Sequence, residues 1–268
     1  MKIIKNSIYA LALVVLFSAC EEKIDLDLSF AGQKPVVEGR VVTETDSSFI
    51  KLTYTAPYNS NQDPQGITNA TVEVAMDNKP PVLFNHVGKG IYKPAAGFVG
   101  EKDHNYSLRV VIDGKEYTSQ SYLYPMFTVD DSLTQEFKAA SGFSDEGYAI
   151  TFYGIYDQKP IKDYWFNFGK NDSLEDGDIV FDNSDLKLNQ RLPFELPFFR
   201  ANKGDSVMLI FRSIDKDVRN YLIALGNLTG DTPGLFQAPP ANPPTNIKGG
   251  AVGFFYSADV IRRWRVVN

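Results

Sequence analysis

Cys20 is the residue whose chemistry the sequence indicates most directly. It is the only cysteine of the 268-residue chain, and it follows the small residues Ser18 and Ala19 at the end of an apolar run from Ile8 to Phe17. A basic start, an apolar run and a small-residue cleavage site are the parts of a secretory signal. A cysteine directly after the cut is typical of a bacterial lipoprotein signal. We therefore expect Cys20 to carry a diacylglycerol group and an N-acyl chain such as palmitate.

Residues 1–19 have two other interpretations, an ordinary signal peptide and a membrane-spanning anchor. The apolar run is shorter than the about 20 residues that a spanning helix needs, and an ordinary signal does not require a cysteine at the cut. The lipid is therefore the predicted link to a membrane, because its buried methylene groups can hold a protein there without a spanning segment.

The densest group of oxygen-bearing side chains lies between positions 171 and 178. Its weak calcium candidates are Asp172, Glu175, Asp176 and Asp178. Calcium takes about six to eight oxygen ligands, which an EF-hand loop supplies through a regular alternation and a terminal glutamate. The stretch lacks both features, so a solvated hairpin loop is the favoured interpretation. We predict no metal and no cofactor.

Catalytic chemistry has little support in the sequence. A Ser-His-Asp arrangement needs a histidine beside the nucleophile, and the two histidines, His86 and His104, both lie in turn-like stretches. Their spacing also matches no zinc-ligand pattern. A glycosidase needs only two carboxylates at the right separation, so a hydrolase stays open in a chain with 33 acidic residues. We assign no catalytic residue and expect a protein that is not an enzyme.

A proline-rich loop near the C-terminus and the strand after it hold the candidates for a partner surface: Asn242, Asn246, Phe254 and Phe255. Lys248, Gly249 and Gly250 also suggest a phosphate loop, but neither a following Ser or Thr nor a helix completes that motif. We interpret the stretch as a rigid loop that feeds a strand, in which glycines allow close packing.

Several aromatic residues of the second half of the chain could stack on sugars. They are Tyr153, Tyr156, Tyr164, Trp165 and Phe168. Aromatic residues that alternate along strands more often fill a core on one face of a sheet. A core role is therefore favoured, and a glycan site is the alternative.

Composition favours β-structure and excludes one class of partner. The chain has 19 Phe and 14 Tyr, with few stretches of helical period, and this mixture is typical of strands. Its formal net charge of −6 falls by a further two units when Lys2 and Lys5 leave with the signal. Attraction to phosphates needs clustered Lys and Arg, and the basic run 262–265 is short, so we expect no nucleic-acid partner.

Apolar and polar residues alternate in many short runs, which predict strands. The predicted strands are residues 36–42, 49–54, 70–75, 90–92, 106–112, 115–118, 148–156, 163–168, 206–212, 253–256 and 263–267. Asp113-Gly114 between two such runs predicts a hairpin. One helix is expected after Asp215, its cap, with Val218, Tyr221, Leu222, Leu225 and Leu228 on one face.

We expect a mainly β fold in two parts after the signal and a tether over residues 20–34. Residues 35–124 are predicted to form an immunoglobulin-like or transthyretin-like β-sandwich. A link centred on Pro125 leads into residues 125–268, a second β-rich domain with one short helix. The tether is predicted to be solvated, because charged runs without aromatic residues bury too little surface to fold.

Motifs along nearly the whole mature chain carry a family resemblance. They include Cys20 with its acidic tether, Val36-Val37-Glu38-Gly39, Gly90-Ile91-Tyr92 and the run from Asn242 to Phe255. In these features the chain resembles the Bacteroidota lipoproteins grouped as the domain-of-unknown-function 4249 family. The resemblance implies an outer-membrane lipoprotein, often encoded beside a TonB-dependent transporter, and it supplies no catalytic residues.

Two short patterns resemble signals used in Bacteroidota. The acidic residues Glu21, Glu22, Asp25 and Asp27 resemble the stretch that directs lipoproteins to the outer face of the outer membrane. Ser132 and Ser173 follow an aspartate and precede an apolar residue, which resembles an O-glycosylation pattern. Ser206 has the same neighbours but begins a predicted strand, so it is the least favoured of the three.

We therefore expect a lipid-anchored protein of the outer membrane that faces the cell exterior. Its expected role is that of an accessory or ligand-capture component of a TonB-dependent uptake system, with the transporter as its partner. The alternatives are a free-standing glycan-binding or adhesion module and, with less support, a hydrolase.

Overall fold

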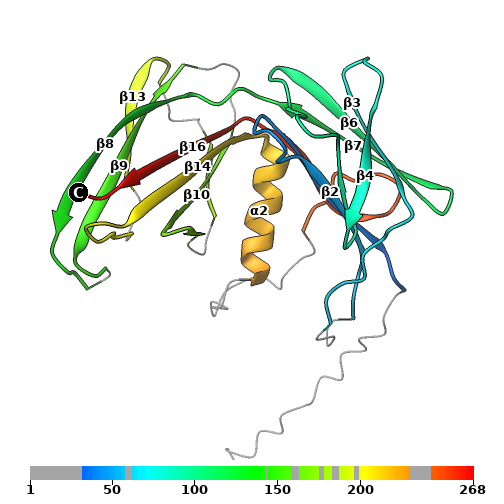
Figure 1. The fold of residues 1–268 in the computed structure, drawn as a ribbon, viewed down its shortest axis with the longest axis horizontal. Coiled ribbons are helices and arrows are strands. Elements are labelled where there is room, and N and C mark those ends of the chain that lie inside the picture. The colour runs from blue at the N-terminus through cyan, green and yellow to red at the C-terminus, as the bar shows by residue number, and fades with distance from the viewer. Residues whose placement is uncertain are drawn as a thin grey trace, which may run out of the picture. The chain divides into compact units, whose positions relative to one another are not determined.

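The computed structural model describes residues 32–57, 62–142, 144–157, 163–174, 178–182, 187–195, 199–229 and 243–268. Figure 1 shows these residues as a coloured ribbon. Several residues of the predictions lie outside them, namely Cys20, Glu21, Glu22, Asp25, Asp27, Glu175, Asp176 and Asn242. The predictions for those residues stay predictions.

Strands dominate the described part of the chain, whose one helix is α2 (Lys216–Thr229). This confirms the predicted mainly β class with one helix. The strands are β1 (Pro35–Val42), β2 (Phe49–Tyr54), β3 (Thr71–Met76), β4 (Val82–Gly88), β5 (Ile91–Lys93), β6 (His104–Ile112), β7 (Lys115–Leu123), β8 (Thr128–Lys138), β9 (Gly147–Tyr156), β10 (Asp163–Lys170), β11 (Ser173–Leu174), β12 (Ile179–Asp182), β13 (Gln190–Glu195), β14 (Ser206–Ile214), β15 (Val252–Ala258) and β16 (Val260–Val266).

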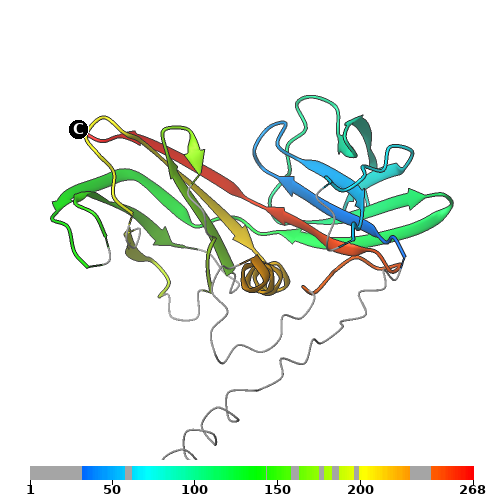
Figure 2. The same ribbon diagram turned by 90° about the horizontal axis from the view of Figure 1, so that it is seen from below.

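The first seven strands join β15 in one eight-stranded sheet, in the order β15-β1-β2-β5-β4-β3-β6-β7. The pairing of β1 with β15 is parallel, and Figure 2 shows the red C-terminal segment beside the blue β1. The two edges of the sheet also meet, since the backbone N–H of Ser257 in β15 donates to Ser121 Oγ in β7 at 2.8 Å. The sheet is thus curled and nearly closed, and the predicted sandwich of two facing layers stays a prediction.

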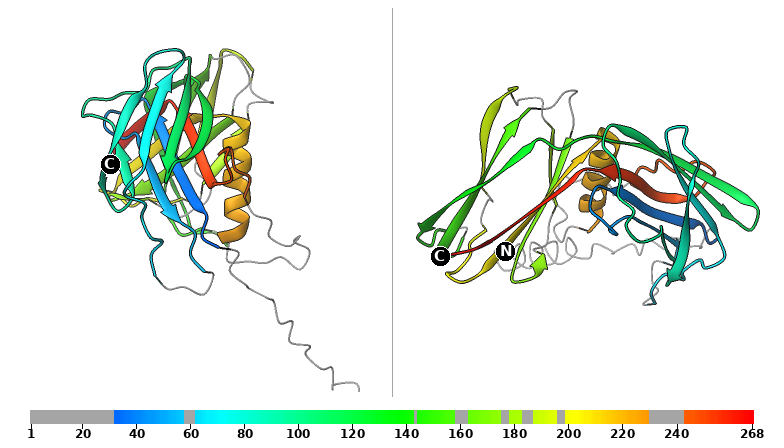
Figure 3. Two further views of the ribbon diagram at one scale, coloured as in Figure 1. Left: turned by 90° about the vertical axis from the view of Figure 1, so that its right-hand side faces the viewer. Right: turned by 45° about the horizontal axis from the view of Figure 1, so that its top comes forward.

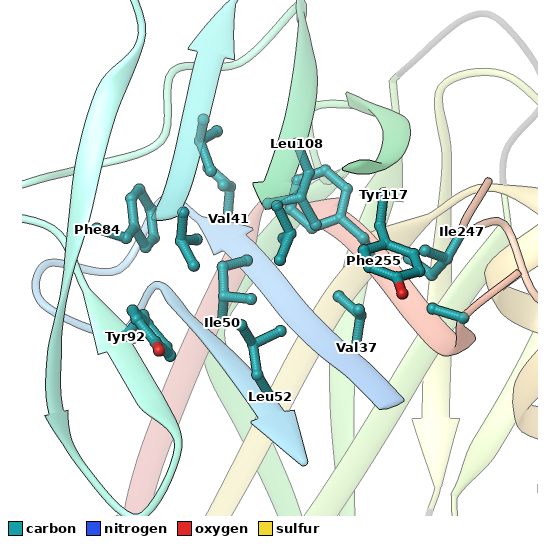
Figure 4. Packing of buried hydrophobic residues seen from close by; sticks show 14 of the residues in the cluster. Val37, Val41, Ile50, Leu52, Phe84, Tyr92, Leu108, Tyr117, Ile247 and Phe255 are labelled. Atoms are coloured by element: carbon teal, nitrogen blue, oxygen red, sulfur yellow. The ribbon is translucent and has the colours of Figure 1, made fainter. Parts of the chain in front are cut away.

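The inner face of this sheet holds an apolar core. Val37 and Val41 of β1 and Ile50 and Leu52 of β2 are all 0% exposed, as the two-residue period of strands requires. Figure 4 shows these side chains gathered with Phe255 of β15. The predicted hairpin between β6 and β7 is confirmed, with positive φ angles of 48° at Asp113 and 81° at Gly114, the backbone that an Asp-Gly turn favours.

Two further sheets follow. One has the order β11-β10-β14-β16, with β12 also paired to β10, and the other has the order β13-β9-β8. Aromatic rings fill the core between them. The ring centroids of Phe152 on β9 and Phe211 on β14 lie 6.1 Å apart in a T-shaped contact, a geometry that aromatic quadrupoles favour.

The C-terminal strands connect the sheets. β15 pairs with β1, β16 pairs with β14, and Asp259 alone separates β15 from β16. The segment Val252–Ala258, which the sequence places in the second domain, thus contributes a strand to the first sheet.

Helix α2 begins as predicted. Asp215 Oδ1 accepts a hydrogen bond from the backbone N–H of Val218 at 2.9 Å, which is the expected cap. Val218 and Leu222 pack against Ile214 and Phe254, with Tyr221 partly buried beside them. This part of the predicted apolar face is confirmed, whereas Leu228 is 40% exposed. Figure 3 shows α2 beside the red C-terminal strands.

The helix cap gives a pH-dependent prediction. Asp215→Ala should lower the free energy of unfolding by about 1 kcal/mol, whereas Asp215→Asn should keep the cap. Burial raises the pKa of Asp215 above its ordinary 3.8, so the folded state holds this proton more tightly than the unfolded state does. The contribution of Asp215 to stability therefore falls as pH rises from 3.8 through the raised folded-state pKa.

Urea unfolding at about pH 4 and about pH 7 measures both effects. Asp215→Asn should lose this pH dependence and match or exceed wild-type stability at the higher pH. An asparagine variant as unstable there as the alanine variant would contradict the prediction.

Candidate functional site

A groove of about 240 Å³ lies between helix α2 and strands β1, β10 and β15, and we call it the α2 groove. It combines aromatic walls with charged side chains, a mixture typical of ligand sites. The groove is lined by Glu38, Gly39, Arg40, Phe49, Trp165, Asp178, Val218, Tyr221, Leu222, Leu225, Phe254 and Tyr256.

Two pairs of aromatic rings form its walls. The rings of Trp165 on β10 and Tyr256 on β15 have centroids 5.8 Å apart in a T-shaped contact. Those of Tyr221 on α2 and Phe254 on β15 lie 4.8 Å apart. Because each pair joins two different elements, the walls are held by the packing of the fold and are formed before any ligand arrives.

Asp178 is fixed beside the Trp165 ring. Its Oδ1 accepts hydrogen bonds from Trp165 Nε1 at 2.7 Å and from Asn167 Nδ2 at 2.6 Å. Trp165 and Asn167 point to the same face of β10, since they are two residues apart in a strand. The carboxylate and the indole therefore hold each other in place, while Asp178 itself stays exposed.

Arg212 lies behind Trp165. The two residues face each other in the register of β10 and β14, and Arg212 Cζ lies 4.2 Å from the centroid of the indole ring. Arg212 is only 7% exposed and donates a hydrogen bond to Asn167 Oδ1. Burial lowers the pKa of Arg212, and the ring and the amide oxygen together stabilise its charge.

Arg40 and Glu38 of β1 supply further charges to the lining. Arg40 Nε donates to the backbone carbonyl of Ser47 at 3.0 Å, and its guanidinium lies 4.7 Å from the centroid of the Phe49 ring. Glu38 forms an ion pair of 3.4 Å with Lys51. Burial, with a smaller contribution from Glu38, raises the pKa of Tyr221, so the phenol keeps its proton at neutral pH.

A larger hollow of about 710 Å³ lies over β3, β6 and β7 and the loop before β15. Its strongest charges are already paired, since Arg109 lies 2.8 Å from carboxylate oxygens of both Glu73 and Glu116. None of the described residues that line it is aromatic. We therefore take the α2 groove as the better candidate.

The predicted aromatic candidates divide between groove and core. Trp165 lines the groove, whereas Tyr164 at 0% and Tyr156 at 6% exposure are core residues. The ring of Phe168 packs against that of Phe199. Tyr153 lies under the guanidinium of Arg191 at 3.8 Å, on the sheet of β9 and β13.

The partner surface predicted at the C-terminal loop needs correction. Phe255 is 0% and Phe254 5% exposed, so neither ring can anchor a partner. Asn246 is bound to the fold, because its side-chain amide both donates to Phe255 O and accepts from Phe255 N, at 2.6 and 3.0 Å. Strand β15 has a core on both faces, with Phe255 toward the first sheet and Phe254 toward α2.

The weak calcium candidates do not meet in the described structure. Asp172 belongs to the turn after β10 and Asp178 to the groove. Over the described ranges, no group of three His, Cys, Asp or Glu residues could hold a metal ion. His104 Nδ1 lies 2.5 Å from Asp77 Oδ2, and the His86 ring packs 5.2 Å from that of Tyr92.

The predicted O-glycosylation residues differ in exposure. Ser132 on β8 and Ser173 on β11 are exposed, whereas Ser206 at the start of β14 is half-buried. The half-buried position of Ser206 agrees with its being the least favoured of the three predicted O-glycosylation residues. Ser132 Oγ also accepts a hydrogen bond from Arg191 at 3.1 Å.

Sequence reasoning missed Arg40, Asn167, Arg212 and Tyr221 as site residues. A signal for Arg212 was present, because an arginine ends the apolar run of the predicted strand 206–212 and arginines are almost never fully buried without a partner. The other three depend on contacts between elements that are distant in sequence.

Comparisons with known proteins place the chain in a family. No helix in the described ranges is long and apolar enough to cross a membrane. No curated protein matches the chain. A family model described as a domain of unknown function (DUF4249) matches residues 21–263, which is most of the sequence. The chain therefore belongs to the DUF4249 family.

Proposed function

We propose that this protein is a lipid-anchored protein of the outer membrane that faces the cell exterior and captures a ligand for a TonB-dependent transporter. The observation that carries the ligand-capture role is the α2 groove, where Trp165 and Asp178 are fixed by a hydrogen bond of 2.7 Å. A site whose aromatic and polar groups are already held in place binds with little loss of side-chain entropy. The anchor is the lipid on Cys20.

Capture fits the groove better than hydrolysis does. A general acid at neutral pH needs a raised pKa, which burial supplies. Burial raises the pKa of Asp163 and Asp215, but neither residue lines the groove. The groove carboxylates Asp178 and Glu38 are both exposed, and Asp178 accepts two hydrogen bonds, so they are suited to bind hydrogen-bond donors.

The test is a pull-down of the affinity-tagged full chain from native membranes in detergent. We expect a TonB-dependent transporter, identified by mass spectrometry of its plug and barrel, to be recovered with wild type. The matched control is Cys20→Ala, which should stay in the soluble fraction because the lipid is the proposed anchor.

Two outcomes contradict the proposal. Recovery of no transporter with wild type removes the uptake role and favours a free-standing binding module. Retention of Cys20→Ala in membranes after a high-salt wash shows that the anchor is not the lipid.

A further inference from the structure

We infer that the α2 groove binds a neutral carbohydrate, with one sugar ring between the aromatic walls. This inference deepens the proposed function and rests on it for the role of the groove. It follows from the balance of charges, from the size of the groove and from the placement of hydrogen-bonding groups.

Charges of both signs surround the groove, so no charged ligand is matched. Among the lining residues, Asp178 and Glu38 are acidic and Arg40 is basic. Arg212 adds a second guanidinium directly behind Trp165. An organic cation would approach the guanidinium of Arg40 and an anion would approach two carboxylates, and like charges disfavour a partner. A neutral ligand that carries both donors and acceptors avoids both penalties.

The size and the walls favour a single ring with apolar faces. Pockets for drug-sized ligands have about 300–1,000 Å³, and the groove offers about 240 Å³. Trp165, Tyr221 and Tyr256 present aromatic surface from three elements. Sugar rings carry C–H groups on their faces and hydroxyl groups at their edges, so they match aromatic walls with a polar border.

The border offers both acceptors and donors at fixed positions. The two hydrogen bonds to Asp178 both use Oδ1, which leaves Oδ2 as an acceptor for sugar hydroxyl groups. Arg40 is held through Nε by the Ser47 carbonyl, so its terminal nitrogens can donate from a fixed place. Hydroxyl groups that both donate and accept can satisfy the two sides together.

The groove has a natural reporter. The chain has two tryptophans, of which Trp165 lines the groove and Trp264 lies on β16, 46% exposed. A Trp264→Phe background makes Trp165 the single reporter, and its fluorescence reports on sugar binding. The lipidated full chain is kept in a detergent without a sugar headgroup, so that detergent does not compete, and calorimetry on the same samples gives a second readout.

The probes are methyl glycosides and short oligosaccharides of glucose, galactose, mannose and xylose, with glucuronic acid and glucosamine as charged comparisons. We expect saturable binding of at least one neutral sugar. Asp178→Asn should weaken it by about tenfold or more, because the amide keeps an oxygen for Trp165 and Asn167 but places a donor where Oδ2 accepted. The matched control is Asp172→Asn, the same change at an exposed turn outside the groove, which should leave affinity unchanged.

Three outcomes overturn the inference: no neutral sugar binds by either readout, a charged sugar binds more tightly than its neutral counterpart, or Asp178→Asn and Asp172→Asn behave alike. The transporter pull-down needs no sugar, so the two proposals fail separately. Recovery of a transporter without sugar binding removes only the carbohydrate, and sugar binding without a transporter removes only the uptake role.

Discussion

Asp259→Ala is expected to lower the free energy of unfolding by about 2–5 kcal/mol, because it removes the buried acceptor of two hydrogen bonds. Asp259 is 3% exposed. Its carboxylate accepts hydrogen bonds from the Thr43 hydroxyl and the Met126 backbone N–H, both at 2.8 Å. Lys102 Nζ lies 2.9 Å from the same carboxylate. Alanine would leave a buried N–H and a hydroxyl without their acceptor.

The position of Asp259 in the fold decides which contacts this loss affects. The residue lies between β15 of the first sheet and β16 of the second. Its backbone N–H donates to Ser213 Oγ on β14 at 3.2 Å, and that hydroxyl donates to the carbonyl of Tyr124. The backbone bond to Ser213 stays in the variant. The two side-chain bonds that are lost join this residue to Thr43 after β1 and to Met126 in the link after β7, so we expect the variant to weaken the contact between the first sheet and that link.

Denaturant unfolding measures the loss, and two variants separate its causes. Lys102→Met should lower stability by less than Asp259→Ala does, because the carboxylate keeps its bonds to Thr43 and Met126 and the lysine side chain is 52% exposed. Asp259→Asn keeps the size and one acceptor, so it should fall between Lys102→Met and Asp259→Ala. Equal losses in Asp259→Ala and Lys102→Met would show that the hydrogen bonds to Thr43 and Met126 contribute nothing.

Local patterns were enough to predict many elements of the fold. The strand predicted at residues 49–54 coincides with β2, and the Asp113-Gly114 turn joins β6 to β7. Helix α2 follows Asp215 as predicted. In each case the signal is a short-range one, namely a period of two, a turn that needs positive φ, or a capping side chain.

Local sequence patterns did not predict strand β8 or the pairing of β15 with β1. β8 (Thr128–Lys138) is rich in polar residues, and its pairing with β9 shifts register between Val129 and Leu133, so alternation is weak. The pairing of β15 with β1 joins residues more than two hundred positions apart. In that position the core of the first sheet covers Phe255 and helix α2 covers Phe254, so the surface predicted at these two residues was wrong.

The sequence predicted only part of the α2 groove, because contacts between distant segments bring its residues together. Trp165 was a candidate because an aromatic residue can be recognised alone. Its function in the groove depends on Asp178, Asn167 and Arg212, which reach it through the pairing of β10 with β14 and through the segment before β12. No spacing rule brings these residues together, so only the folded chain identifies them as one unit.

Gly253→Ala is the second change for which we expect a large effect, a loss of more than about 3 kcal/mol. Gly253 has a φ of +100°, and a Cβ there would lie 2.2 Å from the carbonyl oxygen of Val37 and 2.8 Å from its carbonyl carbon. These are backbone atoms of the paired strand β1, so they cannot rotate away. β15 would have to separate from β1, and the midpoint of thermal unfolding should fall by roughly 6–12 °C.

Gly250→Ala is the matched control, because it shares the backbone conformation but not the crowding. Gly250 has a φ of +90°, and the nearest atom to its Cβ would be Lys115 Nζ at 3.9 Å. It should lose only the about 1–2 kcal/mol that a positive φ costs a residue with a Cβ. Equal losses in the two variants would show that conformation, not the contact with Val37, fixes the glycine. The larger loss at Gly253 should also weaken the α2 groove, since β15 carries Phe254 and Tyr256 into its wall.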